Sequence, residues 1–290
     1  QAKTELERAI TMDPLPGDPY LKMASILEME GRGEEALQWA ERAWKNINFN
    51  ARSTYHSVVF RMMHIYYHVL KNREKALEWA KKGQFMTCGD ARSIYYYYIG
   101  KIASEVGDFK TAEWALRRAM AFPAFASTSA ANLAVVLANQ QKWAEALSIA
   151  ASLSTGLGDS DPTVLDVIGI SASNLGNFDV AIPAFRKAIA LNPGQPIFKR
   201  DLGVTLLRKG DLVESVTLLE EAYAAPELPA QLKSEVEIVL ATASALLVQQ
   251  GVNLTKTGKL PEGIQLLRKA YGSKFISPVL KKHVEDQLNA

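Results

Sequence analysis

The stretch PTVLDVIGISASNLGNFDVAIPAFRKAIALNPGQ, residues 162–195, decides the fold of this chain. Small residues and a proline follow its first glycine at offsets of seven, twelve, nineteen and twenty-four residues, giving Gly169, Gly176, Ala181, Ala188 and Pro193. The same spacing recurs elsewhere in the sequence with a period near thirty-four residues. A fixed period of that length is typical of a stacked array of helices.

Within this stretch the residues predict two helices joined by a tight turn. Asp161 is suited to cap a helix whose first position is a proline, and the apolar residues that follow fall on one helix face. Gly176 tolerates a positive φ and can end that first helix. Gly169 allows the second helix to approach closely, while large residues such as Phe185 fill the remaining space.

Seven copies of the pattern cover most of the chain. We place them at about residues 17–50, 57–90, 93–126, 127–160, 162–195, 196–229 and 244–277. Residues 1–16 match only the second helix of a copy, which favours an excised fragment of a longer repeat protein over a true N-terminal cap. Residues 278–290 predict a polar capping helix. The insertion 230–243 either lengthens the first helix of the last copy or bends the array there.

Two copies depart from the pattern. The second copy has His64 in its first small position and Gly83 in its last, and about six extra residues, 51–56, precede it. The fourth copy has Gln141 at the turn, where other copies have glycine, and Leu153 in its last small position.

This pattern resembles the tetratricopeptide repeat family, most clearly at Gly169, Ala181, Phe185, Ala188 and Pro193 and in turns such as Gly176-Asn177-Phe178. The resemblance implies an all-α fold, a right-handed α-solenoid of antiparallel helix pairs that forms a single array over residues 1–290. It implies a binding surface rather than an enzyme, and it does not identify a partner.

The composition is that of an ordinary soluble protein. Of the 290 residues 48% are hydrophobic and 22% are charged, and the net charge of +2 argues against nucleic acid or an anionic membrane as the partner. No uninterrupted apolar run approaches the roughly 18–20 residues that span a bilayer, so we expect no direct membrane insertion. Cys88 is the single cysteine, which leaves a cytoplasmic and a periplasmic location both open.

No group of residues points to catalysis, a metal or a cofactor. His64 and His68 share one helix, but Ile65 stands where a zinc-protease motif needs glutamate, and two ligands leave a structural site incomplete. Cys88 has no histidine or second cysteine nearby in sequence to activate it, so we expect a structural thiol. We therefore predict no catalytic residue.

The run Tyr95-Tyr96-Tyr97-Tyr98 is the most unusual local feature. On a helix these rings point in four directions. Tyr96 falls on the core position, Tyr95 faces the preceding copy, and Tyr97 and Tyr98 face the inner surface. The exposed pair either fills gaps beside His64 and Tyr67 or forms a binding hot spot, where tyrosine is enriched.

The resemblance implies that the first helices of the copies line a concave face, which is the expected partner-binding surface. The predicted binding residues are Arg61, His68, Tyr97, Tyr98, Lys101, Asn132, Asn139, Asp166, Asn174, Arg200 and Arg208, with Leu21, Ser25 and Asp201 also on this face. The asparagines can donate and accept hydrogen bonds, which suits an extended peptide.

One tetratricopeptide subgroup holds a C-terminal carboxylate with lysine, asparagine and arginine at set positions on three consecutive first helices. Lys101 and Asn132 match fragments of that arrangement, but Tyr97, Thr163 and Val167 occupy the neighbouring positions and supply no positive charge. We therefore do not expect a chaperone-tail binder.

The leading hypothesis is a non-catalytic scaffold that binds a protein or peptide segment in the concave groove. Two alternatives stay open: the repeat portion of a bacterial cell-envelope assembly or polysaccharide-export machine, and a scaffold that self-assembles through its repeat ends. A polysaccharide ligand, stacked on the tyrosines, is less favoured, and an RNA-binding helical repeat is disfavoured by the near-neutral charge.

Overall fold

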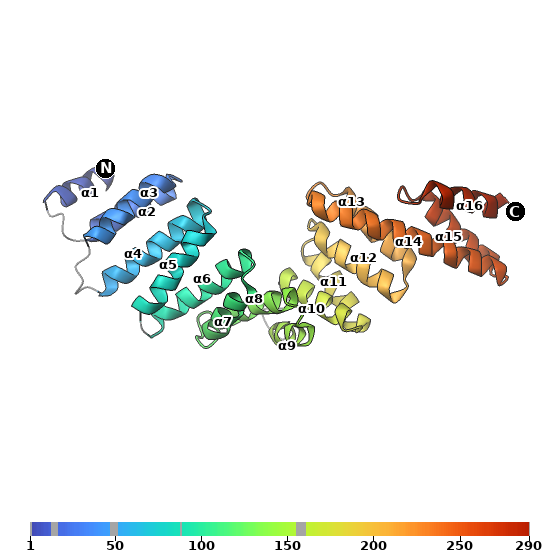
Figure 1. The fold of residues 1–290 in the computed structure, drawn as a ribbon, viewed down its shortest axis with the longest axis horizontal. Helices are drawn as coiled ribbons and strands as arrows, with labels where there is room; N and C mark the ends of the chain where they lie inside the picture. The colour runs from blue at the N-terminus through green and yellow to red at the C-terminus, as the bar shows by residue number, and fades with distance from the viewer. Residues whose placement is uncertain (1, 13–16, 47–51, 88, 155–160, 290) are drawn as a thin grey trace. The chain divides into compact units, whose positions relative to one another are not determined.

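The structure is a computed structural model, and it describes residues 2–12, 17–46, 52–87, 89–154 and 161–289 (Figure 1). Every regular element in these residues is a helix, which confirms the predicted all-α fold. The helices are α1 (Ala2–Met12), α2 (Gly17–Met29), α3 (Gly33–Lys45), α4 (Arg52–His64), the π-helix η1 (Ile65–Val69), α5 (Arg73–Met86), α6 (Ala91–Glu105), α7 (Phe109–Ala119), α8 (Ala126–Asn139), α9 (Trp143–Ser154), α10 (Pro162–Asn174), α11 (Phe178–Leu191), α12 (Pro196–Lys209), α13 (Leu212–Ala224), α14 (Ala230–Lys256), α15 (Leu260–Gly272) and α16 (Pro278–Asn289).

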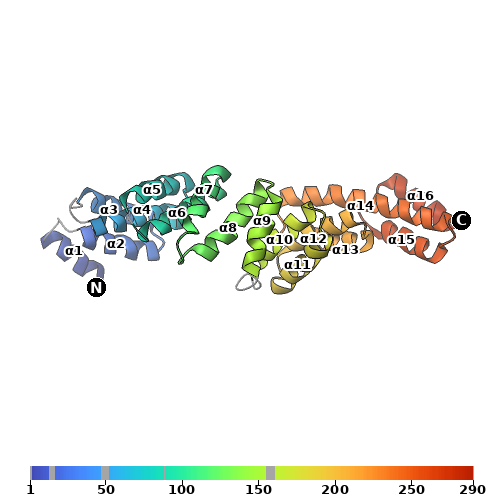
Figure 2. The same ribbon diagram turned by 90° about the horizontal axis from the view of Figure 1, so that it is seen from below.

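The two helices of six copies pack as pairs, α2 with α3, α4 with α5, α6 with α7, α10 with α11, α12 with α13 and α14 with α15, and Figures 1 and 2 show these pairs side by side. We call the first helix of each predicted copy its A helix and the second its B helix. The A helices are α2, α4 with η1, α6, α8, α10, α12 and α14. Five of them, α2, α6, α8, α10 and α12, begin within two residues of the predicted starts of their copies, whereas α4 begins five and α14 fourteen residues earlier.

The chain divides into two compact units, residues 1–141 and residues 142–290, which we call unit 1 and unit 2. Each unit is described by itself below. The continuity of all copies in a single array over residues 1–290 therefore stays a prediction.

A glycine in the A helix allows the paired B helix to come close, as the sequence predicts. A Cβ placed on Gly100 would lie 2.4 Å from a side-chain carbon of Leu116, and one on Gly203 would lie 2.7 Å from the side chain of Leu219. Atoms at that separation clash, so any larger residue forces the two helices apart. The first small position of these copies is thus a contact point between helices.

The turns between paired helices require a left-handed backbone. Gly107, Gly176 and Gly210 have φ values of 80°, 79° and 99°. Lys71 and Gln141 occupy the equivalent turns of the second and fourth copies and also have positive φ, at 54° and 61°. The turn conformation is therefore retained where the sequence departs from glycine, at a cost in backbone strain.

The departures in the second copy have a structural explanation. A Cβ on Gly83 would overlap the ring of Tyr95, whose side chain is fully buried, so this glycine makes room for the first tyrosine of the run. The A helix of the same copy also ends in a π-turn, η1, with the amide of Leu70 bonded to the carbonyl of Ile65. The extra residues before this copy, where described, form the first turn of α4.

The insertion before the last copy lengthens its A helix, which is the first of the two predicted outcomes. α14 has 27 residues, and its added half buries Val236 and Leu240 in the same core as Leu228. By length and mean composition α14 is apolar enough to cross a membrane, although no uninterrupted apolar run is that long. Its apolar residues are used in packing against α13 and α15, so this helix alone is weak evidence for a membrane span.

The two ends of the chain pack as single helices. α1 has no buried residue and rests on α2 through Leu6 and Ile10, which are only partly buried. α16 packs against α14 and α15 and buries Val284.

Candidate functional site

The structure brings six of the predicted binding residues together on the A helices of unit 1. We call this surface the unit 1 A-helix face and define it by Arg61, His68, Tyr97, Tyr98, Lys101 and Asn132, from α4, η1, α6 and α8. His68 is exposed, and the other five are partly exposed. The seventh residue predicted in this unit, Asn139, is exposed at the end of α8.

Aromatic rings form the centre of this face. The ring of Tyr98 lies 5.9 Å from Tyr67 and 6.3 Å from His68, both in edge-on geometry. Tyr97 lies 5.5 Å from Tyr98 and stacks on Phe125 at 5.3 Å. Aromatic pairs at such distances attract one another, so the two tyrosines are held in place while parts of their rings stay accessible.

Burial raises the pKa of both Tyr97 and Tyr98, which keeps their hydroxyl groups protonated as hydrogen-bond donors. Tyr97 also hydrogen-bonds with Asn132, whose amide nitrogen donates to the Thr128 carbonyl at 2.9 Å. The polar contacts therefore join α6 to α8 at one edge of the aromatic centre.

Glu28 of α2 anchors the opposite edge of the face. Its carboxylate forms an ion pair with Arg61 at 2.6 Å and a hydrogen bond with Nδ1 of His64. Burial alone would raise the pKa of Glu28, but the hydrogen bonds and charges of His64 and Arg61 outweigh it and hold that pKa below its ordinary value. Two A helices are thus joined by charge, and the guanidinium group is fixed in orientation.

A second charged group, Glu105 and Arg73, contacts Tyr67, whose ring packs against Tyr98. The hydroxyl of Tyr67 donates to Glu105, which also forms an ion pair with Arg73 at 2.5 Å. Burial, and then the bond to Glu105, raise the pKa of Tyr67 well above its usual range. Arg73 and Lys101 lie over the Tyr67 ring at 4.3 and 5.4 Å, within the range of cation–π attraction.

His64 and His68 do face the same side of the helix, with ring centroids 4.1 Å apart. Burial, and then the charges of His64 and Lys101, lower the pKa of His68, so its ring is neutral at pH 7. Across the described ranges no group of three or more His, Cys, Asp or Glu is placed to hold a metal ion. The predicted structural thiol, Cys88, lies outside the described residues.

The other four predicted binding residues lie on the A helices of unit 2, and three of them, Asn174, Arg200 and Arg208, already have protein partners. Arg200 pairs with Asp201 at 2.6 Å and with Glu235 at 3.7 Å. Arg208 donates to Ser173 at 3.2 Å and lies 3.5 Å from the side-chain oxygen of Asn174. These contacts make the arginines of unit 2 structural links between A helices.

Asp166 of α10, which is partly buried, and Asp201 of α12, which is buried, form an interacting pair of carboxyl groups. Burial, and then the charge of Asp201, raise the pKa of Asp166 to about 8. Burial also raises the pKa of Asp201, against the opposing influence of Arg200. One buried oxygen of each carboxyl has no hydrogen-bond partner among the described residues. The pair therefore carries a proton near neutral pH, because Arg200 offsets only one of the two carboxylate charges and a second charge at this depth is costly.

Several residues of the unit 1 site are not among those predicted from sequence. The residues that the repeat pattern does not single out are Glu28, Arg73, Glu105 and Phe125. The pairing of Glu28 with Arg61 links positions 33 residues apart, close to one repeat period. Opposite charges one repeat period apart are a sequence pattern that predicts such an ion pair between neighbouring A helices.

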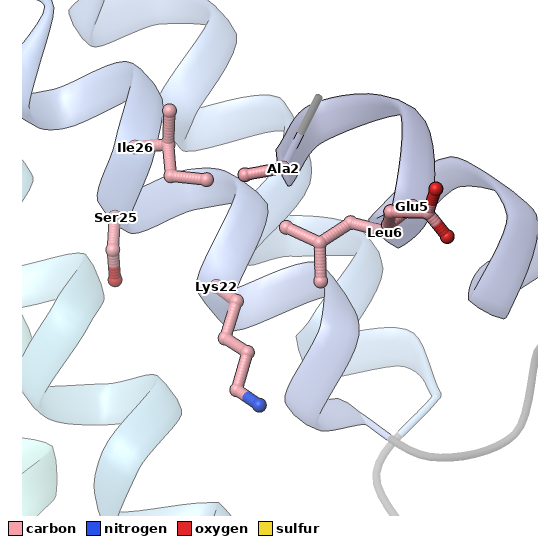
Figure 3. A pocket seen from close by; sticks show the side chains of 6 residues that line it. All are labelled: Ala2, Glu5, Leu6, Lys22, Ser25 and Ile26. Atoms are coloured by element: carbon pink, nitrogen blue, oxygen red, sulfur yellow. The ribbon is translucent and has the colours of Figure 1, made fainter.

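An apolar groove also lies between α1 and α2, separate from the aromatic centre. Its volume is about 470 Å³, and Figure 3 shows Leu6 and Ile26 directed toward one another across it, with Lys22 at its edge. Ser25, predicted to lie on the concave face, also lines this groove, although its hydroxyl is bonded to the Leu21 carbonyl at 2.9 Å.

The comparisons with known proteins agree with the repeat spacing. A tetratricopeptide repeat family model matches residues 167–229. No curated protein sequence matches the chain.

Solved structures share the fold at low identity. A tetratricopeptide repeat protein from Parabacteroides merdae is 12% identical, with a TM-score of 0.62 and coverage of 94% of this chain and 99% of that one. YrrB, described as a tetratricopeptide repeat protein with an unusual peptide-binding site, is 20% identical, with a TM-score of 0.57 and coverage of 71% and 97%. PilF of Pseudomonas aeruginosa is 14% identical, with a TM-score of 0.51 and coverage of 81% and 99%. Residues 167–229 therefore match the tetratricopeptide repeat family, and the chain shares the helical-repeat fold of these solved structures.

Proposed function

We propose that the chain is a non-catalytic scaffold whose unit 1 A-helix face binds an extended segment of a partner protein. The observation that carries the proposal is the pair of part-exposed rings, Tyr97 and Tyr98 of α6, on the same face as Arg61 of α4 and Lys101 of α6. Tyrosine and arginine are the residue types that most often dominate binding energy at interfaces. Tetratricopeptide repeat proteins are generally non-catalytic scaffolds, which agrees with this assignment.

The contacts behind these residues explain why the face suits a partner rather than only filling space. Glu28 orients Arg61, and Phe125 and Tyr67 hold the tyrosines. A surface whose rotamers are already fixed loses little conformational entropy when it binds. Asn132 and the tyrosine hydroxyls can hydrogen-bond the backbone of an extended peptide. YrrB, which shares the fold, is itself described as having a peptide-binding site.

The test is capture of partners from a native lysate, with this chain as bait beside a variant in which Tyr97, Tyr98, Lys101 and Asn132 are replaced by alanine. A control variant carries alanine at Asp179 and Val180, two exposed positions on α11 of unit 2. The proposal expects a partner that the wild type and the control capture and the fourfold variant does not. Equal capture by all three would refute it.

The binding roles of Asn139, Asp166, Asn174, Arg200 and Arg208 stay predictions. The same holds for the cell-envelope, self-assembly and polysaccharide alternatives, and for the compartment.

A further inference from the structure

A second groove lies in unit 1 on the side of the B helices, away from the proposed peptide site. It has a volume of about 400 Å³ and is lined by Lys81, Gln84, Ile99, Lys110, Thr111 and Trp114. Its walls are α5 and α7, the B helices of the second and third copies, and Ile99 of α6 closes its base. We call it the B-helix groove.

Trp114 supplies the exposed apolar surface of the groove, and contacts with neighbouring residues hold its ring in place. Trp114 is 42% exposed, yet its ring contacts Tyr96 edge-on at 5.7 Å and lies 4.6 Å from the Arg118 guanidinium. Phe85, one helical turn beyond Lys81 on α5, is 81% exposed. Large rings that are held in position and open to solvent are the usual anchors of protein interfaces.

The charge around the groove is positive. Lys81 and Lys110 line it, Arg118 lies one turn beyond Trp114, and within the described part of the chain none of the three has an ion-pair partner. Asp108 is the nearby carboxylate, and it accepts a hydrogen bond from the Thr111 amide at 3.2 Å at the start of α7. That bond, and then the charges of Lys81 and Lys110, hold the pKa of Asp108 below its ordinary value, so this single carboxylate faces both lysines. Glu78, on the same helix as Lys81, pairs instead with Lys82 at 2.7 Å.

One polar group in the groove lacks a partner. Gln84 is 8% exposed, and its side-chain amide makes no hydrogen bond to any residue that the structure describes. Its side-chain nitrogen and oxygen are not among the buried unpartnered atoms of the described residues, so the amide is open to solvent in the groove. It gains both a donor and an acceptor contact when a peptide backbone lies alongside it.

We propose that the B-helix groove is a second docking site, which binds an acidic peptide segment carrying one aromatic or large aliphatic side chain. The apolar side chain packs on Trp114 above Ile99. The carboxylates of the segment pair with Lys81 and Lys110, and its backbone hydrogen-bonds with the Gln84 amide. This site is independent of the unit 1 A-helix face, because the residues that define the two surfaces do not overlap.

The test uses a phage library of random twelve-residue peptides, depleted on a Lys81→Glu/Lys110→Glu variant and then selected on the wild-type chain. Both lysines are exposed, so their reversal does not disturb the core. The proposal expects enriched peptides with net negative charge and one large apolar residue. Enrichment of neutral or basic peptides, or no enrichment, would overturn it.

A fluorescein-labelled copy of the most enriched peptide then gives dissociation constants by polarisation. We expect roughly tenfold weaker binding to Lys81→Glu/Lys110→Glu and to Trp114→Ala. Lys256→Glu/Lys259→Glu makes the same change in net charge on exposed residues of unit 2. This control, and the fourfold alanine variant of the unit 1 A-helix face, are expected to bind within twofold of wild type. An unchanged dissociation constant for the first two variants would contradict the proposal.

Discussion

Gly169 lies directly against the ring of Phe185: a Cβ on this glycine would be 2.6 Å from Cε1 of the ring. The same relationship links Gly100 with Leu116, Gly203 with Leu219 and Gly251 with Leu267, each pair separated by sixteen residues in sequence. A small residue in the A helix and a large one sixteen positions later in the B helix therefore form one packing unit, which recurs in both units of the chain.

Replacing Gly169 with alanine is expected to destabilise the protein. Phe185 is fully buried, so its ring cannot move aside cheaply. We expect a loss of about 1–3 kcal/mol in the free energy of unfolding, measured by urea denaturation. Gly272→Ala is the matched control, because a Cβ on this helical glycine meets no atom within 4 Å. Equal effects of the two substitutions would show that the contact does not limit helix approach.

Replacing Lys71 with glycine is expected to stabilise the protein. Lys71 holds a φ of 54° at a turn where other copies have glycine, and a left-handed conformation costs a non-glycine residue roughly 1–2 kcal/mol. Glycine loses part of this gain through its greater freedom in the unfolded chain, so we expect a rise of about 1 kcal/mol in the free energy of unfolding. The reverse substitution, Gly107→Ala, should lower it by a similar amount. A destabilised Lys71→Gly variant would mean that this turn is not strained.

The Asp166–Asp201 pair predicts a specific pH dependence of stability. Because burial raises the pKa of Asp166 to about 8, the folded protein holds a proton that the unfolded chain has lost between the ordinary aspartate pKa, about 4, and pH 8. The free energy of unfolding therefore falls as pH rises through this window.

The side chain introduced by Asp166→Asn cannot ionise. This substitution is therefore expected to reduce the loss of unfolding free energy as pH rises. We expect the variant to be more stable than wild type at pH 8, by on the order of 1–2 kcal/mol, and to show a smaller difference at pH 5. Thermal melts at the two pH values measure this, with Asp179→Asn, on an exposed part of α11, as the control. An Asp166→Asn difference that does not vary with pH would contradict the raised pKa.

The repeat spacing alone predicted the helices, the close contacts and the turns, because each depends on residues within one copy. Gly169 is needed for close helix approach and Gly176 for a positive φ, and both requirements can be recognised directly from the glycine in the sequence. The lengthened α14 was also predictable, since its extra residues continue a helical apolar pattern into Val236 and Leu240.

Contacts between copies were less accessible to sequence reasoning. Two sets of contacts depend on how one A helix is rotated against the next. They are the contacts of Glu28 with Arg61 and His64, and the interaction of Asp166 with Asp201. That rotation is set by packing that no single copy contains. The π-turn of η1 likewise has no distinctive residue in the sequence, although such turns are frequent at functional sites. The B-helix groove was missed because only the A helices were expected to bind.

Binding of a selected peptide to the unit 1 A-helix face tests the central claim most directly. A twelve-residue peptide, selected by phage display on the wild-type chain and depleted on the variant with alanine at Tyr97, Tyr98, Lys101 and Asn132, would be titrated into both proteins by calorimetry. The account predicts a dissociation constant at least tenfold weaker for the variant, since hot-spot residues each contribute on the order of 1–2 kcal/mol. A dissociation constant unchanged in the variant, or a failure to select any peptide on the wild type, would contradict it.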